Sequence, residues 1–317
     1  MIEATLGAEG LERLRTRALV HQMPAAVFSI AGPGALPCLQ GLLTNDLLKP
    51  ANGSLVYGAL LTPKGLIILD CWVIKQADRL LFVADLDART TASDLFRKLL
   101  PPRLARVTDV TGEWQVYRLF GGGAAVPEVE VDGVVVAHRA TATPFAALIA
   151  GPADPVAHAL KLLAVAGART ATNEEWEATR ILAGWARRGA EIDEKTLVQE
   201  VRFDENDGVS YEKGCYTGQE TVARLHFRGH TNRDLRGLAW ADAPVILSEA
   251  PVILSEAKDR SVDTKILLGE KEVGSVRSSL SLPTRRLALA LIRREVETGQ
   301  VVIAGGSPAT VVALPFA

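Results

Sequence analysis

The chain has few cysteines and no excess of charge of one sign. Only three of its 317 residues are cysteines, and they stand far apart at Cys38, Cys71 and Cys215. This spacing excludes a disulfide framework and a Cys-x-x-Cys metal knuckle, and indicates free thiols in a reducing cytoplasm. With 35 basic and 37 acidic residues, the net charge of −2 provides no general field for a polyanion. We therefore expect a cytoplasmic protein without a direct nucleic-acid role.

Charged residues are also missing from one long stretch. Residues 18–45 contain no Lys, Arg, Asp or Glu, as a membrane span or a signal peptide would. Proline at Pro24, Pro33 and Pro37 would break a helix there repeatedly. We interpret the stretch as a buried strand, a turn and a helix, and expect no membrane association.

The order of the expected elements favours an α+β fold. A chain of 317 residues exceeds the usual size of one hydrophobic core, so two or three packed units are expected. Thr-Pro-Lys-Gly at 62–65 predicts a hairpin turn. Strands and helices are mixed without a regular βαβ order. The composition predicts strands at 25–30, 54–61, 66–74, 80–84, 115–120 and 129–137, and helices at 10–20, 91–100 and 155–166.

The last part of the chain has a different pattern. After residue 234, five short β-like runs predict a small barrel or sandwich, at 235–240, 265–268, 272–276, 287–292 and 310–314. We expect two interleaved α+β subdomains over 1–233 and a small β-barrel over 234–317. Between its first two strands, at 243–256, the heptapeptide APVILSE occurs twice. A tandem insertion into a surface loop accounts for this duplication, since loop closure entropy grows slowly with length; an extended β-hairpin arm is the alternative.

Two Thr-x-x-Glu patterns predict helix starts. Thr172 with Glu175 forms one capping box, and Thr217 with Glu220 forms the other. A helix beginning at Thr217 would place Cys215 just before its N-terminus.

Cys215 is therefore a candidate reactive thiol. The helix end and Lys213 should lower its pKa from a free value of about 8.5. Gly214 and Gly218 leave room on both sides of the sulfur, which would let a ligand approach the backbone. A small, packed, inert cysteine is the alternative.

The residues around Cys215 also carry a family resemblance. The string KGCYTGQE at 213–220 resembles the signature of the YgfZ family of folate-binding proteins, which includes a mitochondrial relative acting in iron–sulfur cluster assembly. The chain departs from the family pattern at Leu66, where Arg is usual, and in the duplicated loop. The broader superfamily is that of the glycine-cleavage T-protein. Similar segments cover nearly the whole chain: LQGLLTNDL at 39–47, LLTPKGLIILD at 60–70, RILAGWARRGAEID at 180–193 and LPF at 314–316.

The resemblance implies a T-protein-like fold that binds tetrahydrofolate or a derivative. The T-protein glutamate that binds the pterin ring matches Glu200, whose carboxylate would accept two parallel hydrogen bonds. Arg233 and Arg236 are candidates for the tail carboxylates of folate, because a guanidinium binds a carboxylate bidentately. Trp176 and Trp185 are interpreted as core residues instead. The signature residues assigned to the cofactor are Gly214, Tyr216 as a stacking ring, Gly218 and Gln219.

The resemblance also suggests which residues carry chemistry. T-proteins have an acidic pair at the end of the hairpin, where this chain has Leu69 and Asp70. Asp70 would stabilise positive charge that develops on a folate nitrogen, or would simply cap the hairpin. With Asp70, the catalytic candidates are Cys215 and Lys213. No metal site is expected, because Arg228 and Gly229 separate His226 from His230 and argue against one helix presenting both.

Three functions follow from these expectations. The first is a tetrahydrofolate-binding accessory protein that assists iron–sulfur enzymes, including tRNA-modifying ones, with those enzymes or assembly factors as partners. The second is a tetrahydrofolate-dependent aminomethyltransferase. The third is a scaffold that keeps the fold without a ligand.

Overall fold

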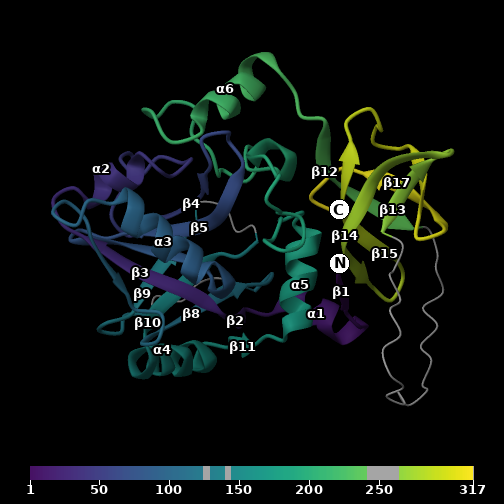
Figure 1. Cartoon of the computed structure of the whole chain (residues 1–317). Coiled ribbons are helices and arrows are strands. Elements are labelled where there is room, and N and C mark those ends of the chain that lie inside the picture. The colour runs from purple at the N-terminus through teal and green to yellow at the C-terminus, as the bar shows by residue number, and fades with distance from the viewer. Residues whose placement is uncertain (124–128, 140–143, 241–263, 317) are drawn as a thin grey trace, which may run out of the picture.

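A computed structural model describes residues 1–123, 129–139, 144–240 and 264–316. They form three β-sheets with helices on their outer faces (Figure 1). The duplicated segment at 243–256 lies outside the described residues. Both chain ends lie beside the same sheet, which is the C-terminal one.

The first sheet contains the predicted hairpin. Its strand order is β4 (Leu55–Leu61), β5 (Ile67–Lys75), β6 (Arg79–Asp85), β3 (Ala25–Ala31) and β7 (Arg106–Asp109), all antiparallel. One face packs against α2 (Ala35–Gln40), the 3₁₀ turn η1 (Leu86–Ala88) and α3 (Arg89–Leu99), over a core that includes Phe28, Phe82 and Phe96. The charge-free stretch, predicted to be one strand, a turn and a helix, contains a further strand, β2 (Leu19–Met23), before β3, the turn and α2.

The second sheet supplies the opposite wall of the central core. Its order is β11 (Arg169–Thr170), β2 (Leu19–Met23), β8 (Trp114–Phe120), β10 (Ala147–Pro152) and β9 (Val135–His138). Helix α4 (Ala153–Val165) covers its outer face through Leu163. Apolar residues from its inner face, the inner face of the first sheet and α5 (Asn173–Leu182) form one continuous core.

The C-terminal region is a closed six-stranded barrel. The strands β14 (Lys271–Ser281), β13 (Lys265–Leu268), β16 (Val301–Ala304), β17 (Ser307–Val312), β12 (Arg233–Trp240) and β15 (Arg286–Arg293) follow one another, and β15 pairs back to β14. The barrel has its own apolar core, which includes Leu238 and Val311. At the N-terminus, β1 (Ile2–Thr5) runs parallel to β14, so the first strand belongs to the barrel sheet. Strand β1 lies within the predicted N-terminal region, 1–233, but pairs with a strand of the C-terminal barrel.

The two predicted helix starts have different outcomes. At Thr172 the capping box is present: Glu175 N donates to Thr172 Oγ1 at 3.2 Å, and Thr172 N donates to Glu175 Oε2 at 2.8 Å. The start predicted at Thr217 is wrong, because α6 (Gln219–Arg228) begins after Gly218 without a side-chain cap. Thr217 N donates instead to Gly41 O, and Gly218 adopts a left-handed φ of 83°.

The other differences lie at element ends and in short strands. The opening helix predicted over 10–20 is α1 (Ala8–Thr16), because the apolar residues from Leu19 onward pair with β8 as strand β2. The strands that were not predicted are β1, β2, β7, β10, β11 and β16, and the strand predicted at 129–137 begins only at Val135. In the described parts of the chain, no helix is long and apolar enough to cross a membrane.

Candidate functional site

A cavity of about 710 Å³ lies between the first two sheets and beneath α5. This volume is typical of small-molecule sites, which range over about 300–1,000 Å³. Strands β5 and β6 form one side, strands β2 and β8 form the other, and the chain after α5 forms the edge. Its polar lining includes His21, Asp70, Asp85, Asp87, Arg118, Asn173, Glu177, Arg180, Arg187 and Arg188.

Aromatic side chains form much of the remaining lining. Trp72 and Trp185 stack at a centroid distance of 5.6 Å with an interplanar angle of 14°, and Phe145 lies 4.8 Å from Trp72. Trp176 contributes a further ring from α5. Large flat rings with few polar atoms provide contact area for a planar heterocycle. The sequence interpretation placed Trp176 and Trp185 in the core; both rings are indeed packed, yet both also line the cavity.

The carboxyl group of Asp70 lies in the cavity lining together with these aromatic rings. Tyr57, which pairs with Trp72 across β4 and β5, donates its hydroxyl to Asp70 Oδ2 at 3.1 Å. Desolvation raises the pKa of Asp70 to about 7, and the negative charge of Asp85 adds to this rise. The Tyr57 hydrogen bond and the positive charge of Arg188 act against it. Near neutral pH, Asp70 can therefore either accept or give up a proton.

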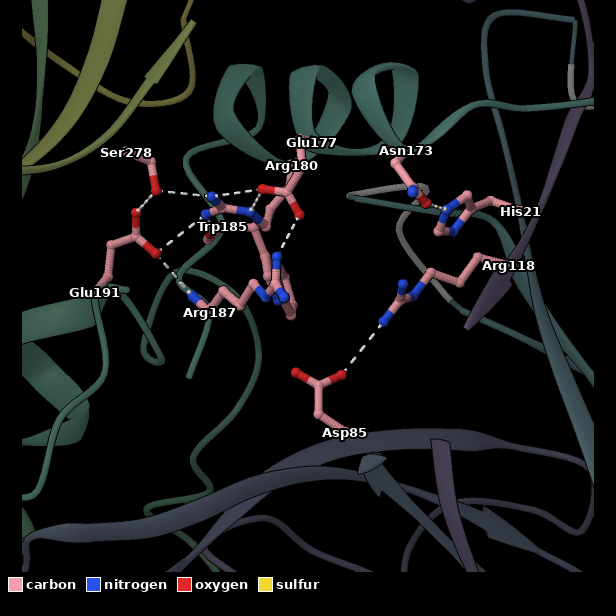
Figure 2. Close-up of polar contacts among 10 residues, drawn as sticks. All are labelled: His21, Asp85, Arg118, Asn173, Glu177, Arg180, Trp185, Arg187, Glu191 and Ser278. Atoms are coloured by element: carbon pink, nitrogen blue, oxygen red, sulfur yellow. Dashed lines mark hydrogen bonds and ion pairs between the residues drawn. The ribbon is translucent and has the colours of Figure 1, made fainter. Parts of the chain in front are cut away.

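A second carboxylate stands opposite Asp70. On β5 and β6 Trp72 faces Val83, and continuing this register by two residues places Asp70 opposite Asp85. Asp85 Oδ1 lies 3.6 Å from Arg118 Nη2, a separation shown in Figure 2. The sequence has one acidic residue at the end of the hairpin, but the neighbouring strand supplies another.

A buried polar network, the Arg180 network, connects the cavity edge to the barrel (Figure 2). Arg180 is 1% exposed and donates to Glu177 Oε2 at 2.9 Å, to Glu191 Oε2 at 3.1 Å and to Ser278 Oγ at 2.8 Å. Ser278, on β14, donates in turn to Glu191 Oε1 at 2.5 Å. We define the network by these four side chains. It fixes α5, the chain after α5 and the barrel relative to one another.

Glu200, Arg233 and Arg236 lie at the barrel side and do not line this cavity. Arg233 donates to both carboxylate oxygens of Glu200, at 2.9 and 3.2 Å. Leu197 N donates to Glu200 Oε2 at 3.0 Å. Arg236 contacts Asp234 and Thr298, each at 3.4 Å. The structure thus brings Glu200 and Arg233 together as an ion pair, and a pterin bound at Glu200 would have to replace Arg233.

The signature loop, residues 213–220, is held against the end of α2 and the β4–β5 turn. Lys213 Nζ donates to the carbonyl oxygens of Gln40, Leu43 and Asn45 at 2.6, 2.6 and 2.9 Å. Burial lowers the pKa of Lys213 to about 8. At Gly218, a Cβ would stand 2.5 Å from Thr62 O, so only glycine fits this contact.

The remaining signature residues keep the loop together. Gln219 Oε1 accepts a hydrogen bond from Tyr216 N at 3.1 Å, and Tyr216 is buried beneath Lys213 Nζ, 4.9 Å from its ring centroid. A Cβ at Gly214 would meet no heavy atom within 4 Å. Cys215 is exposed, and neither it nor Tyr216 lines the 710 Å³ cavity. Among the described residues, no three His, Cys, Asp or Glu gather as a metal site.

Sequence reasoning missed several cavity residues, chiefly His21, Asp85 and Arg118. They lie on three strands, β2, β6 and β8, and none belongs to a recognisable motif. A charged residue among the apolar residues of a predicted strand, as at Arg118, was the one signal available.

Comparisons with known proteins agree with this architecture. Residues 8–126 match the family model of the GCVT N-terminal domain. The solved structure of glycine cleavage system aminomethyltransferase T from Bartonella henselae superposes with a TM-score of 0.73 at 17% identity, over 98% of this chain and 89% of that one. This similarity establishes a shared fold.

Sequence relatives narrow the comparison. A protein titled iron-sulfur cluster assembly factor IBA57 homolog, mitochondrial, from Neurospora crassa is 25% identical over 95% of this chain and 73% of its own. Its counterpart in Mycosarcoma maydis is 24% identical over 64% of this chain, which spans about half (52%) of that relative. The tRNA-modifying protein YgfZ of Sodalis glossinidius is 25% identical over 68% of this chain and 69% of its own.

The two-sheet core and the closed barrel are those of the glycine cleavage aminomethyltransferase T fold, and the N-terminal part of the chain matches the GCVT N-terminal domain. Together with the sequence relatives, these matches support a YgfZ-type protein of the glycine-cleavage T-protein superfamily. The family and the α+β fold expected from the sequence are thereby confirmed.

Proposed function

We propose that this chain is a tetrahydrofolate-binding accessory protein for the assembly or repair of iron–sulfur clusters. It would support iron–sulfur enzymes, including those that modify tRNA, and would contact these enzymes or their assembly factors in the cytoplasm. The names of the sequence relatives support the biological role. The observation that carries the proposal is the aromatic cavity containing Asp70, in a chain of the T-protein fold.

The cavity suits a reduced pterin in both size and chemistry. Its volume of about 710 Å³ accommodates the bicyclic ring and part of the attached benzoyl group. Trp72, Trp176 and Trp185 offer flat apolar contact, while Asp70 and Asp85 offer acceptors for ring N–H and amino groups. Arg187 and Arg188 stand at the more exposed edge, where the tail carboxylates of folate would emerge.

An alternative placement uses the residues suggested by the family resemblance. There Glu200 would bind the pterin, Tyr216, Gly214, Gly218 and Gln219 would contact it, and Arg233 and Arg236 would bind the tail. The ion pair between Glu200 and Arg233 is the obstacle to this placement. Tetrahydrofolate titrations separate the two. Asp70→Asn and Trp185→Leu should weaken binding at least ~10-fold if the cavity is the site, whereas Glu200→Gln should then leave the affinity within ~2-fold. The reverse pattern would move the site to Glu200, and no saturable binding would leave a scaffold without a ligand.

Cys215 is proposed to act in the iron–sulfur role. Its exposed position, with open space over Gly214, suits contact with a protein partner or an oxidant. A strain lacking this protein should lose iron–sulfur enzyme activity under oxidative stress, and a Cys215→Ala copy should fail to restore it. Full rescue by Cys215→Ala would remove the thiol from the mechanism.

One observation favours a second candidate, aminomethyl transfer to tetrahydrofolate. Asp70 is positioned in the cavity with a pKa of about 7, where its ionised form would stabilise positive charge on a folate nitrogen. We assign Lys213 no role in this reaction, since its ammonium group is bound to three carbonyl oxygens. The test is formation of methylenetetrahydrofolate from an aminomethyl-lipoyl carrier and pure protein. No turnover with a protein that binds tetrahydrofolate would eliminate this activity.

A further inference from the structure

Two buried polar side chains in the cavity have nitrogen atoms without a hydrogen-bond partner in the structure. His21 on β2 and Arg118 on β8 stand directly opposite one another in the strand pairing and are 6% and 8% exposed. Neither His21 Nδ1 nor Arg118 Nε has a partner. Both residues line the cavity, and Figure 2 shows them beneath α5 with Asp85 on the other side. Buried polar atoms without partners are rare in folded proteins and suggest that something else satisfies them.

The two side chains present opposite hydrogen-bonding character. His21 Nε2 lies 2.9 Å from Asn173 Oδ1, an acceptor, so Nε2 carries the proton. Burial lowers the pKa of His21, which keeps the ring neutral and leaves a lone pair on Nδ1. Arg118 can only donate. A donor and an acceptor are therefore held side by side.

Packing fixes the orientation of both groups. The guanidinium carbon of Arg118 lies 4.2 Å from the centroid of the Trp176 ring, and the His21 ring stacks on Trp176 at 6.0 Å. The ionic contact of Arg118 with Asp85, at 3.6 Å, is too long for a direct hydrogen bond. The pair is thus preorganised, and its remaining hydrogen-bonding capacity is available to a ligand.

We propose that His21 and Arg118 recognise the lactam edge of the pterin, with Arg118 donating to the ring carbonyl oxygen and His21 Nδ1 accepting from the adjacent ring N–H. This inference rests on the proposed binding of tetrahydrofolate in the cavity. The complementary edge has one acceptor beside one donor, as a cyclic amide does. A carboxylate or phosphate fits less well, because one of its oxygens would face the lone pair of His21 and because Asp70 and Asp85 occupy the opposite wall.

The test compares tetrahydrofolate with its 4-amino-4-deoxy counterpart, in which the carbonyl oxygen becomes an amino group and the neighbouring nitrogen loses its proton. This analogue keeps the size, the tail and the stacking area but reverses the edge. Anaerobic calorimetric titration of the wild-type chain should show tetrahydrofolate binding at least ~10-fold more tightly, because the reversed edge places donor against donor at Arg118. Wild-type protein alone gives this result, so no variant has to fold for the comparison to be made.

Variants then assign the preference to the pair. In Arg118→Met the preference for the 4-oxo compound should fall to near one, and His21→Phe should reduce it. The matched control is Arg79→Met, because Arg79 also lies over a tryptophan, with its guanidinium carbon 5.6 Å from the Trp114 ring centroid, but does not line the cavity. Equal affinity of wild-type protein for both compounds would overturn the inference and leave folate binding intact. Binding of neither compound would overturn the proposed function as well. An unchanged preference in Arg118→Met would also overturn the assignment.

Discussion

The cavity and the signature loop differ in how their residues are held and in what they leave free. In the cavity, side chains from β2, β5, β6 and β8 meet from distant parts of the sequence, and some of their polar atoms have no partner. In the signature loop, neighbouring residues bind backbone: Lys213 is fully engaged with three carbonyls, and Gly218 fits tightly against Thr62. Within residues 213–220, the exposed ones are Gly214, Cys215 and Glu220. The comparison indicates that a sequence motif can consist mostly of residues that position one exposed sulfur atom. The cavity, which has the features of a ligand site, contains no recognisable motif.

The prediction with the largest expected effect removes Arg180, the centre of the network that holds the edge of the cavity. Arg180→Met should lower the unfolding free energy by about 3–5 kcal/mol, because Glu191 would stay fully buried without its cationic partner, with only Ser278 and the backbone to bind it. Urea unfolding measures the effect. Lys49→Met is the control, since Lys49 and Glu212 form an exposed pair whose loss should leave stability essentially unchanged. A small effect of Arg180→Met would mean that barrel and cavity are not linked through this network.

The next test uses the titration of Asp70. The pKa of Asp70 is about 7 in the folded protein and about 4 in an unfolded chain. Between pH 4 and pH 7, the native state therefore holds a proton that the unfolded chain has released. The proton stabilises the fold below pH 4, and this contribution is lost as pH rises to about 7. Asp70→Asn should abolish this pH-dependent loss of stability. Relative to the variant, wild-type protein should therefore lose about 2 kcal/mol between pH 4 and pH 7, after allowance for solvent screening. Parallel stability profiles of the two proteins would contradict the assignment.

A smaller effect is expected in the signature loop. Lys213→Met leaves three carbonyl groups without their donor and should cost about 1–2 kcal/mol. Amide exchange should quicken in the segment after α2 and in the signature loop. Tetrahydrofolate affinity should stay unchanged if the cavity is the site. A parallel loss of affinity would instead connect the loop to the ligand.

The same contrast explains what the sequence could predict. The hairpin, the Thr172 cap and the barrel strands follow from local patterns of turn residues, capping residues and alternating apolar residues. The helix start at Thr217 failed because tertiary contacts of Thr217 and Gly218 replaced the local cap. The addition of β1 to the barrel is a contact between the two ends of the chain, which local patterns do not contain.

The candidate site was predicted less fully than the fold. Asp70 was found through the resemblance of its hairpin to that of T-proteins, and it lies within strand β5. Its neighbour Asp85 and the His21–Arg118 pair depend on strand register and on the packing of two sheets, which the sequence alone does not reveal. The ion pair of Arg233 with Glu200 was missed for the same reason, because these residues are 33 positions apart.

The last prediction separates the two regions with a single atom. Cys215→Ala removes an exposed sulfur that contacts neither the cavity nor a buried core, so unfolding free energy should change by less than about 0.5 kcal/mol. Tetrahydrofolate affinity should stay within ~2-fold of wild type, measured by the same calorimetric titration. Rescue of iron–sulfur enzyme activity should nevertheless be lost. Because Cys38 and Cys71 stay in place, the matched variant Cys38→Ala controls for general loss of a thiol. If Cys215→Ala weakened tetrahydrofolate binding, the sulfur and the ligand would share one site, and the division between cavity and signature loop would fail.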